Sequence, residues 1–151
     1  MRKVIISDTS CLIILSKINE LDLLKNVYEN IVTTTDIMAE FGEILPDWID
    51  VQNVKDLHKQ QLLEMQIDKG ESSAIALALE NDNSTVILDD YKARKVAHLL
   101  GINYTGTIGV IVKAKLSGII PSIKPVLEKN KQTNFRISTE LEITALKEAN
   151  E

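Results

Sequence analysis

Residues 3–10, KVIISDTS, and residues 86–94, VILDDYKAR, decide how this chain is expected to fold. In each stretch an aliphatic run without polar alternation ends at aspartate, at Asp8 in the first and at Asp89 and Asp90 in the second. Such an uninterrupted run is typical of a strand that is buried on both faces of a parallel sheet. The side chains that follow each run are those that begin helices, so a strand followed by a helix is predicted at both places.

Strands and helices are predicted to alternate along the whole chain. We expect strands over 3–7, 30–34, 49–54, 85–88 and 102–105, and helices over 11–17, 20–28, 37–41, 56–65, 71–80, 91–100, 106–116, 122–131 and 139–149. This alternation predicts a three-layer α/β/α sandwich around a mainly parallel sheet of four or five strands. In such a sheet the binding crevice lies beyond the carboxyl ends of the strands.

The size of the chain favours one domain. A chain of 151 residues can bury a substantial core, so we expect a single domain over residues 1–151. Cys11 is the only cysteine, which excludes an internal disulfide. Because no apolar stretch reaches the length of a membrane span, we expect a cytoplasmic protein that has no contact with membranes.

The charge of the chain argues against binding to nucleic acid through basic residues alone. The formal net charge is −5, and aromatic residues make up only 4% of the chain. A basic binding surface and a platform for base stacking are therefore both disfavoured. A nuclease that uses metal ions stays compatible with this composition, because cations held by carboxylates can meet the phosphate.

Acidic residues from separate segments are expected to meet at the crevice. Asp8 and Asp89 each follow a buried strand, and Glu71 begins a helix just after Gly70. A single aspartate at such a place is better explained as a helix cap, and a single glutamate as a partner of the helix dipole. Two aspartates at equivalent positions favour a site.

Glu40 is the fifth acidic candidate, after Asp8, Glu71, Asp89 and Asp90. It follows three apolar residues, so it either is buried with a partner or lies on an exposed helix face. Carboxylates that converge in this way raise one another's pKa unless a cation neutralises them. Oxygen ligands without histidine or cysteine select Mg²⁺ or Mn²⁺, which can activate water for phosphodiester hydrolysis.

Three neighbours of these acids are candidates for contact with a substrate. Ser10 could hydrogen-bond a metal-bound water or cap the helix that follows it. Lys92 and Arg94 could guide a phosphate backbone, although a solvated helix face is the commoner explanation of such residues. Cys11 and His98 lack any catalytic motif and are interpreted as structural.

Taken together, ISDTSCLIIL (6–15), MAEF (38–41), GESSAIALALE (70–80) and VILDDYKAR (86–94) resemble the PIN-domain family. The order and spacing of the acids match that family across nearly the whole chain. A narrower likeness joins the chain to a branch in which these motifs precede a segment similar to GTIGVIVKAKLSGII (106–120).

The resemblance implies an α/β/α fold, a Mg²⁺ or Mn²⁺ site, and ribonuclease activity on single-stranded RNA like that of VapC-type toxins. It also implies a small antitoxin partner and frequent homodimerisation. By position, Asp8, Glu40 and Glu71 match the first three family acids, Asp89 or Asp90 matches the fourth, and Ser10 matches the hydroxyl that follows the first.

The leading hypothesis is therefore a metal-dependent ribonuclease. One alternative is a PIN-like module that binds RNA or a protein without cutting. Another is a phosphatase similar to the haloacid dehalogenases, with Asp8 as nucleophile. That chemistry normally requires a general-acid aspartate two residues after the nucleophile, where this chain has Ser10.

Overall fold

Five strands form one sheet in the computed structural model, which describes residues 3–151, so residues 1 and 2 of the expected domain lie outside the described residues. The strands are β1 (Val4–Ser7), β2 (Ile31–Thr34), β3 (Ile49–Gln52), β4 (Ser84–Ile87) and β5 (Asn103–Thr105). Their order is β3-β2-β1-β4-β5, and every neighbouring pair is parallel. The expected parallel sheet is thus confirmed, with the predicted 49–54 strand at one edge.

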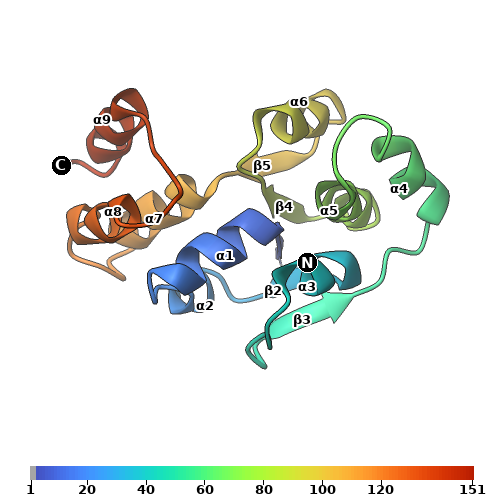
Figure 1. Ribbon diagram of the computed structural model, residues 1–151, viewed down its shortest axis with the longest axis horizontal. Coiled ribbons are helices and arrows are strands. Elements are labelled where there is room, and N and C mark those ends of the chain that lie inside the picture. The colour runs from blue at the N-terminus through green and yellow to red at the C-terminus, as the bar shows by residue number, and fades with distance from the viewer. Residues whose placement is uncertain (1–2) are drawn as a thin grey trace.

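Helices cover both faces of this sheet. They are α1 (Thr9–Lys17), α2 (Asp22–Val27), α3 (Thr35–Phe41), α4 (Leu57–Leu63), α5 (Lys69–Leu79), α6 (Tyr91–Leu99), α7 (Thr107–Leu116), α8 (Lys124–Lys131) and α9 (Thr139–Glu148). In Figure 1, α1, α2 and α7 to α9 lie on one side of the sheet, and α4, α5 and α6 lie on the other. This arrangement confirms the three-layer α/β/α fold.

The order of the strands creates a switch point between β1 and β4. From β1 in the centre the chain moves to β2 and β3 at one edge, then returns through α4 and α5 to place β4 on the other side of β1. The ends of the two strands are in register, with Ser7 opposite Ile87. In open parallel sheets, ligands bind beyond the strand ends at such a point. Asp8 and Asp89 follow these two strands.

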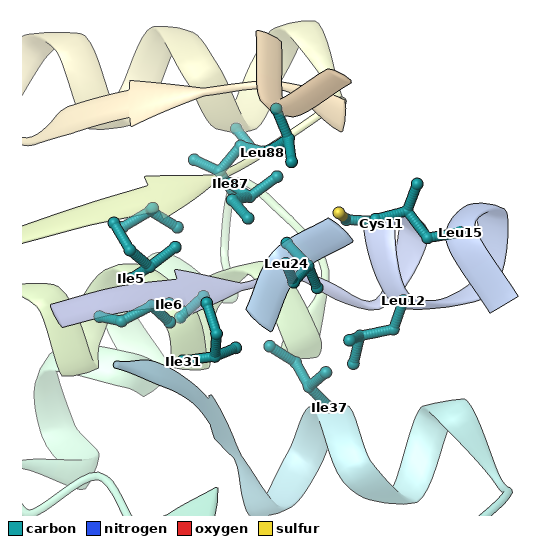
Figure 2. Packing of buried hydrophobic residues seen from close by; sticks show 14 of the residues in the cluster. Ile5, Ile6, Cys11, Leu12, Leu15, Leu24, Ile31, Ile37, Ile87 and Leu88 are labelled. Atoms are coloured by element: carbon teal, nitrogen blue, oxygen red, sulfur yellow. The ribbon is translucent and has the colours of Figure 1, made fainter. Parts of the chain in front are cut away.

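The central strands are buried on both faces, which explains their uninterrupted apolar sequences. Ile5, Ile6 and Ile87 have almost no exposed surface. Figure 2 shows these side chains in one cluster with Leu12 of α1 and Leu24 of α2. The packed core holds the ends of β1 and β4 in fixed positions. It therefore also fixes the backbone positions of the acids that follow these strands.

All predicted elements are present, and the differences lie at their ends. α1 begins at Thr9 instead of residue 11, because the side chain of Asp8 accepts a hydrogen bond from the Cys11 nitrogen and caps the helix there. α5 begins at Lys69, so Gly70 lies inside its first turn and does not precede the helix as expected. Within residues 3–151, no helix is long and apolar enough to cross a membrane.

Candidate active site

Asp8 lies at the end of β1 and is only 2% exposed. Its carboxylate accepts hydrogen bonds from the Cys11 nitrogen at 2.9 Å and from the Asp89 nitrogen at 3.2 Å. Burial raises the pKa of Asp8 well above its usual value, and the charge of nearby Asp89 raises it further. Asp8 is thus a helix cap, as the simpler interpretation predicted, and also a link between the ends of β1 and β4.

Asp89 and Asp90 are exposed, and their carboxylates are held by different elements. The Asp89 carboxylate accepts hydrogen bonds from the nitrogen and the hydroxyl of Thr107, at 2.8 and 2.5 Å. Asp90 caps α6 by accepting a hydrogen bond from the Ala93 nitrogen at 3.0 Å. The interpretation of Asp89 as merely the cap of the helix that follows it is wrong, because Asp90 takes that position and the Asp89 carboxylate is bound by Thr107 at the start of α7.

Glu71 lies in the first turn of α5, where Asp68 caps the helix by accepting a hydrogen bond from the Glu71 nitrogen at 3.0 Å. Burial, followed by the charges of Asp68 and Asp90, raises the pKa of Glu71 to about 7. The helix therefore brings Glu71 within the electrostatic influence of Asp90. Asp68 was not among the predicted residues, although an aspartate directly before a helical run is a capping signal.

Glu40 is on the exposed side of α3, which decides between the two interpretations of this residue. The Thr9 hydroxyl donates a hydrogen bond of 3.1 Å to its Oε1 atom. The carboxylate lies directly over Gly70, where an added Cβ atom would come within 1.7 Å of Oε1. Partial desolvation there raises the pKa of Glu40, and the charge of Asp68 adds to this effect. Gly70 thus makes room for Glu40 beside α5.

The three predicted substrate contacts have different surroundings. Ser10 is half-buried in the first turn of α1, and Asp8 takes the capping position that Ser10 was expected to share. Lys92 is exposed on α6, as a solvated helix face would be. Arg94 is half-buried, with its guanidinium carbon 5.2 Å from the centre of the Tyr104 ring. Of these basic residues, only Arg94 is packed into the fold.

The acids supply only oxygen donors, which suit a hard divalent cation in chemical type. Among residues 3–151, however, no three acidic, histidine or cysteine side chains converge closely enough to hold an ion together. The raised pKa values of Asp8 and Glu71 reflect burial and mutual repulsion that a cation would relieve.

The comparison with protein families agrees with this fold. The family model DUF3368, described as a PIN domain, matches residues 4–151. The chain therefore belongs to the PIN-domain family, and the resemblance predicted from its motifs is confirmed. Its fold is of the nuclease type, in a family whose members typically use divalent metal ions. Among curated proteins, no significant match is found.

Proposed function

We propose that this protein is an endoribonuclease that cuts single-stranded RNA with the help of Mg²⁺ or Mn²⁺. The observation that supports the proposal is that Asp8 and Asp89 follow β1 and β4 at the switch point of a PIN fold and are linked by the hydrogen bond from the Asp89 nitrogen to the Asp8 carboxylate. Besides burial, the charges of Asp89 and Glu71 raise the pKa of Asp8, and the charge of Asp90 raises that of Glu71. Repelling carboxylates at a ligand-binding edge indicate that a positive charge belongs between them.

Each acid has a proposed role. Asp8, Glu71 and either Asp89 or Asp90 would hold the ion, with Glu40 holding or orienting it through water. The bound ion would polarise the scissile phosphate and lower the pKa of a water molecule. The chain contributes rigidity, because backbone N–H groups of Cys11 and Asp89 fix the Asp8 carboxylate before any substrate arrives.

The remaining predicted residues would serve the substrate. Ser10, next to the acids in α1, would hydrogen-bond a water molecule bound at the site. Lys92 and Arg94, on the helix that follows Asp90, would attract the RNA backbone. Their positive charge is needed because the chain as a whole carries a net charge of −5.

The biological role that we propose is that of a toxin in a toxin–antitoxin pair, held inactive by a small antitoxin and assembled as a homodimer. Membership of the PIN family supports this role by resemblance to VapC-type toxins. Light scattering on the purified protein tests whether it is a homodimer. Arrest of cell growth when expression of the protein is induced tests whether it is a toxin. Growth and cell RNA that stay unchanged on induction would contradict the toxin role.

The proposed activity is tested with a mixed-sequence single-stranded RNA, with and without Mn²⁺. We expect RNA cleavage that requires the ion. Asp8→Asn should reduce the cleavage rate by more than roughly 10–100-fold, which is the usual cost of changing a residue in the outer shell of a metal site. Asp82→Asn is the matched control, since Asp82 is exposed and precedes β4 at the opposite end of that strand. Cleavage that survives in Asp8→Asn would overturn the proposal.

One alternative remains distinguishable by the same experiment. Binding of RNA without cleavage at saturating Mn²⁺ would identify a non-catalytic PIN-like module. The phosphatase alternative lacks support, because the family that matches is the PIN family.

A further inference from the structure

A cavity of about 450 Å³ lies beside the acids, between the β5–α7 junction and the C-terminal segment. Asp89 borders it, together with Gly106 and Thr107 of that junction. Its volume is within the range of roughly 300–1,000 Å³ that is usual for small-molecule sites. Anything bound in the cavity would therefore lie against the carboxylate proposed to take part in cleavage.

Two arginines line this cavity without an acidic partner. Neither Arg94 nor Arg136 forms an ion pair among the described residues, and the Nε atom of Arg94 is buried without a hydrogen-bond partner there. A buried donor that is left unpaired costs free energy unless a ligand accepts its hydrogen bond. Among the described residues, the acids that line the cavity are Asp89 and Glu148, and neither forms an ion pair with the two arginines.

Gly106 lies between the first arginine and the acid site. A Cβ atom added there would be 3.0 Å from Oδ1 of Asp89 and 4.0 Å from the guanidinium carbon of Arg94. The absence of a side chain at Gly106 thus lets the Asp89 carboxylate and the Arg94 guanidinium group both lie close to the backbone there. Arg94 and Asp89 therefore line the same end of the cavity.

Much of the remaining wall is apolar and aromatic, although Asn130, Thr144 and Glu148 also line it. Two rings, Tyr104 and Phe135, line it together with the aliphatic residues Ile108, Ile137 and Leu141. Proteins that recognise single-stranded RNA stack unpaired bases on aromatic rings and on guanidinium planes. The cavity therefore offers both parts of a nucleotide site, with cations for a phosphate and apolar walls for a base.

We propose that this cavity, here called the arginine pocket, binds one nucleotide of the RNA next to the scissile phosphate. Arg94 and Arg136 take the phosphate, and the base lies among Tyr104, Phe135 and Leu141. The proposal rests on the ribonuclease function proposed above and adds a prediction to it. The enzyme should prefer particular bases at one position beside the cut, because the pocket has a defined shape.

Binding is tested apart from cleavage. The probe is a short, fluorescently labelled single-stranded RNA of mixed sequence, titrated in EDTA so that no ion-dependent cleavage occurs. We expect Arg94→Gln and Arg136→Gln each to weaken binding by about tenfold or more, because each removes charge-assisted hydrogen bonds. Leu141→Trp should weaken it as well by filling the pocket. Lys95→Gln, an exposed position on the same helix as Arg94, is the matched control and should bind like wild type.

The outcomes separate this proposal from the ribonuclease function. Wild-type affinity in all three pocket variants overturns the arginine pocket, even if cleavage is intact. An equal loss in Lys95→Gln also overturns it, because a general basic face would then explain binding. Weakened binding in the pocket variants supports the pocket, even if no cleavage is ever seen. Arg136 is exposed, so its variant is expected to fold and keeps the test valid if Arg94→Gln does not fold.

Discussion

The carboxylate of Asp89 accepts two hydrogen bonds from Thr107, one from its nitrogen at 2.8 Å and one from its hydroxyl at 2.5 Å. This pair joins the end of β4 to the start of α7. The adjacent carboxylate of Asp90 turns to the first turn of α6 instead. Two neighbouring negative charges are thus accommodated because each is held by donors from a different helix.

The Thr107 hydroxyl is predicted to stabilise the fold and to position Asp89. Thr107→Val keeps the shape of the side chain but removes the donor, so we expect a loss of about 1 kcal/mol in the free energy of unfolding, less than for a buried charged pair because Asp89 is exposed. RNA cleavage should fall with it. Urea unfolding and cleavage assays measure the two effects. Thr107→Ser should restore both, and a valine variant as stable and active as wild type would contradict the prediction.

Gly70 is predicted to be needed for RNA cleavage because it leaves room for the carboxylate of Glu40. In Gly70→Ala the added methyl group would occupy the place of the Glu40 carboxylate, which must swing away and lose its hydrogen bond from Thr9. Alanine favours a helix over glycine by roughly 0.5–1 kcal/mol, so the fold should be kept. Cleavage should fall to the level of Glu40→Gln, as measured under identical conditions. Full activity in Gly70→Ala would show that the position of Glu40 is not needed.

Glu71 is predicted to make the metal-free protein less stable as the pH rises. Its pKa is about 7 in the folded state against 4.5 for an ordinary glutamate, so the folded state holds this proton more tightly. Stability is therefore lost as the pH rises from about 4.5 through about 7. Glu71→Gln removes this loss and should melt a few degrees above wild type at pH 8, with no such gain at pH 4. Thermal melts in EDTA measure the difference.

The control for that experiment is Glu43→Gln, at an exposed position in the loop after α3. Its melting temperature should follow wild type at both pH values. A gain in Glu71→Gln that is the same at pH 4 and pH 8 would contradict the assigned proton, because it would reflect packing and not charge.

Divalent ions are predicted to stabilise the folded protein. A ligand present at a hundred times its Kd adds about 2.7 kcal/mol to the free energy of unfolding, so saturating Mn²⁺ should raise the melting temperature clearly. The rise should be larger at pH 8 than at pH 5, because protonated carboxylates do not bind the ion. EDTA should reverse it. A melting temperature that is indifferent to Mn²⁺ at pH 8 would contradict the proposed site.

The parts of this account that the sequence predicts are those encoded by local patterns. The apolar runs before Asp8 and Asp89 indicate buried parallel strands, and that alone places both residues at one edge of the sheet. The local pattern does not predict that Asp90 caps α6 while Asp89 accepts hydrogen bonds from Thr107, because Thr107 lies 18 residues further along the chain. α5 begins two residues before the predicted position, because the Asp68 cap outweighs the poor helix propensity of Gly70.

The arginine pocket could not be predicted either, because the residues that form it are far apart in the sequence. Its walls come from α6, β5, α7 and the C-terminal segment, which are brought together only by tertiary packing. In the sequence, Arg136 has no feature that relates it to Arg94.

The central claim is that the acids at the ends of β1 and β4 hold a divalent cation, and calorimetric titration with Mn²⁺ at pH 8 tests it most directly. The account predicts saturable binding to the wild-type protein and to Asp82→Asn, and binding at least about tenfold weaker in an Asp8→Asn protein that is folded by circular dichroism. Equal binding in wild type and Asp8→Asn, or no saturable binding to the wild-type protein, would contradict it.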